Sequence, residues 1–179
     1  MLESCLDYLC CPNCKKNLII NNNKFVCNYC NIEFGISEDI IKMLPRTGEY
    51  SDITIKKWDL IYKKQQINNS YYSEFEHYNN FYFKDTYIQL KKEKSFGKNL
   101  VYLEIGCGQF FLGQKISNEF KIIIGIDISF EALKIAKKML DEKFKRQVVE
   151  SVLSGSVSQV ELARKYTISP LLISRYKKE

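Results

Sequence analysis

The sequence predicts a composite fold in which α+β and α/β units follow one another along 179 residues. Three observations predict it. Six of the seven cysteines fall in the first 30 residues, a glycine turn joins strand and helix patterns in the middle, and helix-capping residues recur near the end. We expect a cysteine-rich ribbon over 1–45, a helical, aromatic-rich connector over 46–95, a βαβα unit over 96–140 and three short helices over 141–179.

The composition is that of a folded, water-soluble protein. Hydrophobic residues make up 45% of the chain and charged residues 27%. No apolar run approaches the roughly 18 residues that a membrane span requires. An acid, Glu3, stands where a signal peptide would carry bases, and no apolar stretch follows it. We therefore expect a cytoplasmic protein without a membrane partner.

The net charge of +6 is unevenly distributed. Over 141–179, eight Lys and Arg residues stand against five Asp and Glu residues, which leaves a net charge of +3 in the last 39 residues. A short basic segment favours a polyanionic partner, because opposite charges steer association. The alternative interpretation is a solvated helix surface with no such partner.

The cysteines have the spacing of a metal site. Two residues separate Cys11 from Cys14 and Cys27 from Cys30, and twelve residues lie between the pairs. Two-residue spacing lets both thiolates of a pair reach one ion, and four thiolates complete the tetrahedral shell of a structural zinc. The alternatives are four buried free thiols, or Cys10 in place of Cys11. The proline that follows Cys11 favours Cys11 as the ligand.

The twelve-residue insert predicts a hairpin that turns at Asn21–Asn23. The segment after the second cysteine pair resembles the end of small zinc-ribbon domains found beside methyltransferases, with an aromatic strand, an Asp-containing turn and an Ile-x-x-Leu-Leu-Pro-like exit. This resemblance covers residues 6–45 and implies a module that positions a nucleic-acid or protein substrate, or activates a partner methyltransferase. The family usually has glycine where this chain has Ile40. The matching positions are Phe34, Asp39, Ile41, Leu44 and Pro45.

A glycine turn follows the first strand of the middle segment. Gly106 and Gly108 would let the backbone pass close to a ligand, and the next helix would add N–H donors. A second strand ends in Asp127, 21 residues after Gly106, where a carboxylate can accept both hydroxyls of a ribose. A helix capped by Ser129 follows and runs to residue 140.

Glu104 precedes the first glycine by two residues, and the turn therefore resembles motif I of class I S-adenosylmethionine-dependent methyltransferases, with Asp127 at motif II. The resemblance implies a partial Rossmann-like unit. In that unit Glu104, Gly106 and Gly108 line the methionine end of S-adenosylmethionine, and Asp127 binds the ribose. Phe110 replaces the usual third glycine, and its ring could crowd the cofactor. The alternative is a βαβ core without a ligand.

The connector carries many aromatic side chains, and in related enzymes such a segment caps the cofactor pocket. We favour the alternative of helical core packing with some surface tyrosines. His77 is the only histidine, and a solvent-facing side chain explains it better than a general base. The aromatic residues include Trp58, Tyr62, Tyr71, Tyr72, Phe75, Tyr78, Phe81, Tyr82, Phe83 and Tyr87.

Capping signals predict the three C-terminal helices. The first begins near residue 144 and ends at Gly155. Ser158 and Glu161 form a capping box that opens the second, and Ser169 with the proline after it opens the third. The expected core residues are Leu162, Ala163, Tyr166, Ile168, Ile173 and Tyr176.

Residues 142–179 resemble the N-terminal helix-turn-helix of insertion-sequence transposases. The resemblance implies a DNA partner, with the third helix in the major groove. Tyr176 replaces the usual Trp, Thr167 the usual turn glycine, and Leu171–Leu172 the usual polar residues. These leucines would contact thymine methyl groups or a partner. The expected phosphate contacts are Arg164, Lys165, Arg175, Lys177 and Lys178. The expected base contacts are Ser169, Ser174 and Arg175.

Only two strands of a methyltransferase sheet are recognisable before the C-terminal stretch begins, and no acidic triad of a transposase nuclease follows. Three hypotheses fit. The one we favour is a methyltransferase gene interrupted by an insertion element near residues 140–143, which leaves a fragment without methyl-transfer activity. The others are a regulatory DNA-binding protein, and a methyltransferase that a partner chain completes.

Overall fold

The computed structural model describes residues 3–43, 52–67, 84–93, 96–155, 157–166 and 168–178. Some sequence-based expectations fall outside these ranges. They concern Leu44, Pro45, His77, Thr167 and the aromatic residues between 71 and 83.

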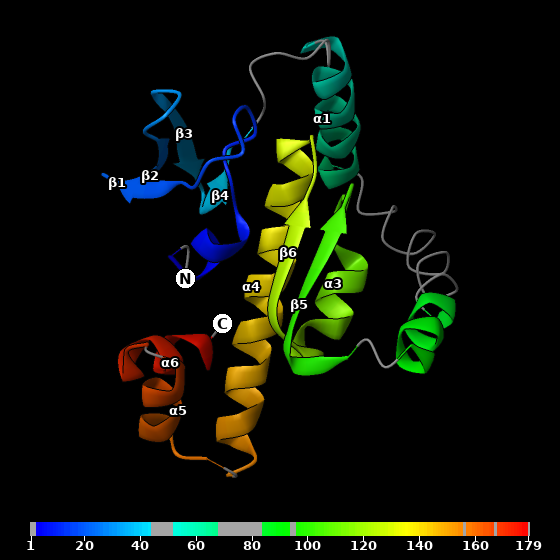
Figure 1. The fold of residues 1–179 in the computed structure, drawn as a ribbon. Coiled ribbons are helices and arrows are strands. Elements are labelled where there is room, and N and C mark those ends of the chain that lie inside the picture. The colour runs from blue at the N-terminus through cyan, green and yellow to red at the C-terminus, as the bar shows by residue number, and fades with distance from the viewer. Residues whose placement is uncertain are drawn as a thin grey trace.

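The elements form an N-terminal group, a middle group and a C-terminal group (Figure 1). The N-terminal group contains a short 3-10 helix, Glu3–Tyr8, and the strands β1 (Ile19–Asn21), β2 (Lys24–Cys27), β3 (Ile32–Ser37) and β4 (Ile40–Ile41). The middle group contains α1 (Asp52–Ile67), a helical segment over 84–92, β5 (Gly97–Ile105), α3 (Phe111–Ile116), a 3-10 turn (Ser117–Glu119) and β6 (Phe120–Ile126). The C-terminal group contains α4 (Phe130–Leu153), α5 (Gln159–Tyr166) and α6 (Pro170–Tyr176).

The N-terminal strands form an antiparallel meander in the order β1-β2-β3-β4. Asn22 and Asn23 make the turn between β1 and β2, and both have left-handed backbones with φ of 46° and 58°. Two left-handed residues define the turn whose twist suits a two-residue hairpin, and asparagine tolerates that conformation. The predicted Asn turn is therefore confirmed. Glu38 and Asp39 make the turn between β3 and β4 in the same conformation, with φ of 54° and 59°.

The middle group contains a two-stranded parallel sheet of β5 and β6, joined through α3. Val101 pairs with Ile122 and Ile105 with Ile126, so the two carboxyl ends lie at the same edge. Tyr102 and Ile123 point toward the helices, where they pack with Phe110 of the α3 N-terminus. The expected parallel strand–helix unit is thus present, with α3 and α4 on one side of the sheet (Figure 1).

One expectation about α4 is wrong. The sequence pattern predicts one helix up to residue 140 and another from about residue 144, whereas α4 is a single helix from Phe130 to Leu153. The residues between are Asp141, Glu142 and Lys143, and no glycine or proline interrupts them. Since such residues cost little in a helix, nothing there stops the hydrogen-bond ladder. Among the described residues, no helix has both the length and the apolar character that crossing a membrane demands.

The second half of α4 packs with α5 and α6 around a separate small core. Val148, Leu162, Ala163 and Ile173 are at most 6% exposed and form its centre. Phe144 packs edge-on against Tyr166, with ring centroids 5.1 Å apart. The expected core positions in this three-helix unit are therefore the ones that pack together.

Side-chain caps delimit these helices as predicted. The Ser129 hydroxyl accepts the Ala132 N–H at 3.2 Å at the start of α4, and the Ser169 hydroxyl accepts the Leu171 N–H at the start of α6. Gly155 follows α4 with a left-handed φ of 69°. At the start of α5, Ser158 and Glu161 form the reciprocal pair of a capping box, because each accepts the other's backbone N–H, at 2.9 and 3.2 Å.

The cysteine-bearing meander rests on α4. Asp39 of the β3–β4 turn approaches Lys137 of α4 at 3.6 Å, and the Lys42 ammonium lies 4.1 Å from the centroid of the Phe130 ring. Both contacts involve exposed or half-buried side chains, so each contributes little energy by itself. They identify the face of the meander that is turned toward α4.

Candidate metal centre and glycine turn

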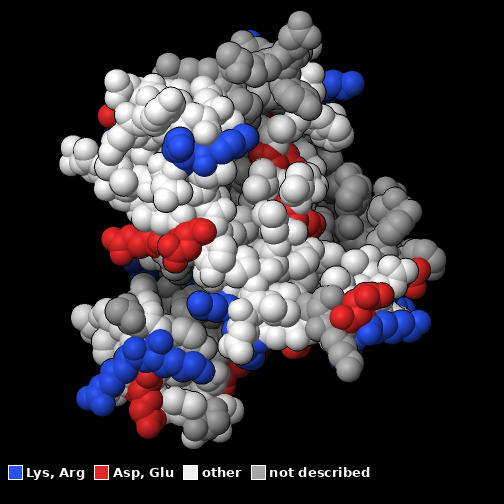
Figure 2. Space-filling view, in the orientation of Figure 1, with Lys and Arg blue, Asp and Glu red and all other residues white. Residues whose placement is uncertain are grey.

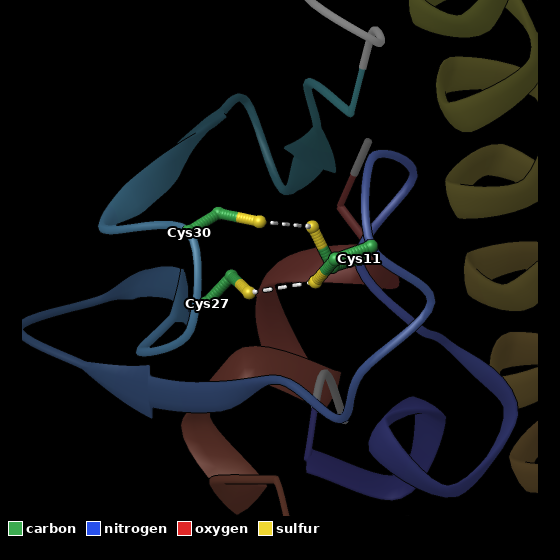
Figure 3. A group of neighbouring side chains, drawn as sticks. Cys11, Cys27 and Cys30 are labelled. Atoms are coloured by element: carbon green, nitrogen blue, oxygen red, sulfur yellow. Dashed lines mark hydrogen bonds between the residues drawn. The ribbon is translucent and has the colours of Figure 1, made fainter.

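The four paired cysteines converge on one point. Their sulfur atoms all lie within 4.8 Å of one another, and they come from two loops, the Cys11–Cys14 knuckle and the turn between β2 and β3 (Figure 3). The Cys11 and Cys30 sulfurs are 4.0 Å apart, and those of Cys14 and Cys27 are 3.5 Å apart. A zinc ion bound at about 2.3 Å by four thiolates separates the sulfurs by about 3.8 Å. The cluster therefore fits a tetrahedral zinc.

Local backbone geometry builds the two loops. The Cys11 carbonyl accepts the Lys15 N–H at 2.9 Å, and the Cys11 N–H donates to the Lys16 carbonyl, also at 2.9 Å. Lys15 and Asn31 each follow a cysteine pair and have left-handed φ values of 62° and 52°. This conformation turns the chain sharply after each pair, which brings both sulfurs of a pair to the same side.

The thiols of the cluster titrate unequally. Burial raises the pKa of Cys11. Hydrogen bonds from the N–H groups of Cys14 and Asn13 and from the neighbouring thiols outweigh this effect and bring the pKa down to about 7. The hydrogen bond that the Cys30 thiol donates to Cys14, followed by burial, raises the pKa of Cys30 to about 12. One sulfur thus ionises easily while another keeps its proton. A metal would have to displace that proton, so metal affinity must rise with pH.

A small apolar core surrounds the sulfurs. Cys11 and Cys27 are fully buried, and Phe25 is buried with them. Cys10 is exposed and lies outside the cluster, so Cys11 is the member that the fold selects. The other buried members of this core are Leu18, Ile32 and Phe34.

The glycine turn closes at the carboxyl ends of β5 and β6. Gly106 and Gly108 have left-handed φ values of 69° and 51°. The N–H groups of Gly106 and Cys107 both donate to the Ile126 carbonyl, at 2.7 and 3.0 Å. The Asp127 carboxylate accepts the Gly108 N–H at 2.8 Å. The structure thus brings three of the predicted cofactor residues together at one edge of the sheet.

The fourth predicted cofactor residue, Glu104, lies on the helix side of β5. Its carboxylate accepts the Tyr102 hydroxyl at 3.0 Å and the Gly113 N–H at 3.3 Å. Burial raises the pKa of Glu104, and these two hydrogen bonds offset part of that effect. The two hydrogen bonds hold this carboxylate against β5 and the start of α3, beside the glycine turn.

Phe110 does not lie over the glycine turn, as its place in the motif had suggested. It has a left-handed φ of 59°, and its side chain is 4% exposed. A Cβ on Gly113 would come within 2.2 Å of the Phe110 ring, and one on Gly125 within 3.0 Å. These two glycines therefore leave the space that the ring fills in the core. The ring therefore packs in the core and does not project from the glycine turn.

Helix α1 supplies two residues at this edge: Asp59, which the sequence did not single out, and Tyr62, one of the aromatic residues of the connector. The Asp59 carboxylate accepts the Ser129 hydroxyl at 2.6 Å and the Glu131 N–H at 3.2 Å, and so adds a second cap to α4. The Tyr62 hydroxyl lies beside Gly108, where an added Cβ would come within 2.7 Å of it. The i, i+3 spacing of Asp59 and Tyr62 was the available signal that both lie on one helix face.

The side chains expected to contact DNA are displayed on α5, α6 and the residues after α6. All except Ser174 are exposed. The Ser174 hydroxyl instead accepts the Gln159 amide at 2.7 Å, and the same amide donates to the Pro170 carbonyl at 2.6 Å. Gln159 thus ties the start of α5 to the start of α6, a role that sequence reasoning missed. The exposed residues are Arg164, Lys165, Ser169, Arg175, Lys177 and Lys178.

Comparison with known proteins adds no further constraint. No protein-family model matches the sequence, and no curated protein matches it.

Proposed function

We propose that this chain is a fragment of a class I S-adenosylmethionine-dependent methyltransferase, stabilised by a structural zinc ribbon and joined to a DNA-binding helix-turn-helix. In this proposal the chain binds S-adenosylmethionine but does not transfer a methyl group by itself. The observation that carries the proposal is the meeting of Gly106, Gly108 and Asp127 at the carboxyl ends of two parallel strands. Ligands of open α/β sheets bind at this edge.

Zinc is held by Cys11, Cys14, Cys27 and Cys30. Four thiolates leave no open position for water or substrate, so the ion would supply folding energy and no catalysis. The fit rests on sulfur separations close to those of a tetrahedral site.

For the cofactor, each proposed contact follows from position and charge. Asp127 is half-buried and is anchored by the N–H groups of Gly108 and Ser129, both at 2.8 Å, which holds its carboxylate toward the turn. A carboxylate so placed can accept ribose hydroxyls. The left-handed Gly106 and Gly108 allow the methionine part to approach the backbone, with Glu104 beside it.

The absence of methyl transfer follows from the size of the sheet. In the described residues the parallel sheet has two strands, and no helix of that part covers its second face. An acceptor substrate needs a pocket wall opposite the cofactor, and strands beyond β6 would have to provide it. After β6 the chain instead continues through α4 into the C-terminal helices.

Calorimetric titration of the zinc-loaded full chain with S-adenosylmethionine tests this proposal. We expect binding, and we expect Asp127→Asn to weaken it at least about tenfold, which corresponds to about 1.4 kcal/mol. Asp7→Asn is the matched control, because Asp7 is exposed and far along the chain from the turn. Circular dichroism must show that both variants fold. No binding at about 1 mM cofactor, near the weak limit of specific recognition, would contradict the proposal.

DNA binding is a second function with its own supporting observation. Figure 2 shows Lys and Arg side chains gathered over the region of α5 and α6. The serine caps and the Gln159 contacts to Pro170 and Ser174 hold α6 at a defined angle to α5. A rigid helix with exposed cations at its end is suited to lie in a groove and hold phosphates.

Fluorescence anisotropy with short DNA duplexes over a range of salt concentrations tests this function. Each lost phosphate contact should lower the slope of log affinity against log salt by about one. Arg175→Ala and Lys177→Ala should each do so, whereas Lys98→Ala, an exposed lysine on β5, should leave the slope unchanged. Equal effects from all three variants would indicate general attraction to a cationic protein and would refute a specific role for α6.

A further inference from the structure

An aromatic ring is displayed in the middle of the second cysteine pair. Tyr29 stands between Cys27 and Cys30, in the turn between β2 and β3, and it is 75% exposed. Both flanking sulfurs belong to the four-cysteine cluster, so this turn is held at its two ends (Figure 3). Tyrosine side chains are usually at least partly covered, since their burial removes a large apolar surface from water. Here the ring is available as a flat contact surface on a fixed turn.

Two lysines accompany this ring. The Lys16 ammonium lies 6.0 Å from the centroid of the Tyr29 ring, at the outer limit of a cation–π contact. The Lys15 ammonium donates to the Pro12 carbonyl at 2.9 Å, which holds it beside the first cysteine pair. Both lysines are exposed. The convergence of the two cysteine pairs thus brings an aromatic face and two cations to neighbouring places on the surface.

No acidic residue interrupts this part of the ribbon. Between Asp7 and Glu33 the sequence has three lysines, seven asparagines and no Asp or Glu. Lys24 is paired with Glu33, whereas Lys15 and Lys16 have no acidic partner in the described part of the chain. Asparagine amides carry both donors and acceptors. The segment therefore offers positive charge together with groups that can hydrogen-bond to nucleic-acid bases.

We propose that Tyr29, Lys15 and Lys16 form a binding site for single-stranded nucleic acid. One base stacks on the Tyr29 ring, and the two ammonium groups hold phosphates of the adjacent nucleotides. Proteins commonly bind single strands by this combination of aromatic faces and cations. A single strand offers unstacked base faces, whereas the bases of a duplex are stacked on one another. The exposed Asn28 amide, next to the ring, can hydrogen-bond to a base edge.

This site lies on a different unit from the proposed cofactor turn and from the proposed duplex-binding helices. Binding at Tyr29 therefore depends on neither of those functions. An acidic peptide is a second class of ligand that the two lysines would attract. Base stacking distinguishes the two classes, because a peptide carboxylate needs the cations and not the ring.

Fluorescence anisotropy of the zinc-loaded full chain with an end-labelled strand of about 12 deoxythymidines, at about 50 mM salt, tests the proposal. We expect binding, and we expect Tyr29→Ala to weaken it about 5- to 150-fold, the range that loss of one stacked base produces. Tyr29→Phe keeps the ring and should bind like the unmodified chain. Tyr8→Ala is the matched control, since Tyr8 is a second exposed tyrosine of the N-terminal group, at 44%. It should leave the affinity unchanged.

Two further measurements separate stacking from charge. An abasic strand of the same length keeps the phosphates and lacks the bases, so Tyr29→Ala should bind it as well as the unmodified chain does. Lys16→Ala should lower the slope of log affinity against log salt by about 0.7, the value for one phosphate contact to a single strand. Arg175→Ala, in the helix-turn-helix, should not change the affinity for the thymidine strand.

Zinc content and circular dichroism must show that every variant is folded. No binding at about 100 μM protein, near the weak limit of non-specific nucleic-acid binding, overturns the proposal. Equal binding by Tyr29→Ala and the unmodified chain also overturns it, since it would show attraction to phosphate charge alone. A loss in Arg175→Ala without one in Tyr29→Ala would assign the strand to the C-terminal helices. Displacement of the strand by poly-glutamate of equal charge and concentration would identify an acidic peptide as the ligand, and it too overturns the proposal.

Discussion

Loss of one zinc ligand should unfold the cysteine-bearing meander and leave the rest of the chain folded. The perturbation is Cys27→Ser, at a residue that is fully buried at the end of β2. The matched control is Cys10→Ser, which changes an exposed cysteine outside the cluster. Both substitutions replace sulfur by oxygen, and they differ in burial and in whether the residue belongs to the metal site.

The small core of the meander sets how much its stability depends on zinc. Ordering the segment Cys11–Ser37 costs roughly 25–30 kcal/mol at about 1 kcal/mol per residue. The four buried apolar side chains other than cysteine return about 6–12 kcal/mol at 1.5–3 kcal/mol each. A structural zinc adds about 10–16 kcal/mol. Burial and zinc together supply about 16–28 kcal/mol, which reaches the ordering cost only at its upper end, whereas burial alone falls far short of it. The meander therefore has no stable fold without its metal.

Hydrogen exchange measured by mass spectrometry distinguishes the two regions. In Cys27→Ser, or after chelation, amides of β2 and β3 should exchange as fast as in an unfolded peptide. Amides of α4, α5 and α6 should stay protected, because the core around Val148, Leu162 and Ile173 contains no part of the meander. Cys10→Ser should bind one zinc per chain and exchange like the unmodified protein. Persistent protection of β2 and β3 after complete removal of zinc would refute the reasoning.

Three further predictions concern the other two units. Gly113→Ala should destabilise the middle unit by about 1–3 kcal/mol, because the added Cβ would clash with the Phe110 ring. Gly35→Ala is the control, since the space around Gly35 is open and its Cβ would clash with nothing. Chemical denaturation compares the free energies of unfolding of the two variants. Ser158→Ala should lower the stability of the C-terminal unit by about 1 kcal/mol through loss of the cap, measured in the same way. Hydrogen bonds from the Ser158 hydroxyl and N–H lower the pKa of Glu161. Their contribution to stability is therefore present above the ordinary Glu pKa and is lost as the pH falls through the lowered pKa. In Glu161→Gln the melting temperature, followed by circular dichroism, should fall less steeply over this acid range.

Local signals predicted the parts of the fold that local chemistry determines. The spacing of Cys11, Cys14, Cys27 and Cys30 identified the metal cluster, since two-residue loops leave little freedom in where the sulfurs point. The asparagine turn was also predictable, because asparagine tolerates the left-handed conformation that a tight hairpin needs. The same holds for the serine caps, which act within three residues of themselves.

Contacts between distant segments were not predictable in the same way. Asp59 reaches Ser129 across 70 residues, and no pattern within α1 names that partner. The direction in which the Phe110 side chain points could not be predicted either. Its motif position suggested a ring over the turn, but the space left by Gly113 and Gly125 draws the ring into the core instead. When a side chain can point to either side of the backbone, tertiary packing determines its direction, and that packing involves residues distant in the sequence.

The continuity of α4 changes how the join between the two halves is understood. Lys143 lies beyond the position where the sequence changes character, yet its ammonium donates back to the Ser117 hydroxyl at 2.9 Å and to the Gln114 carbonyl of α3. The C-terminal part of α4 is therefore bonded to the βαβα unit as well as to α5 and α6. A helix of 24 residues spans about 36 Å, so α4 connects the two units along its whole length. The glycine turn and the C-terminal helices are thus held at a defined separation by one rigid element.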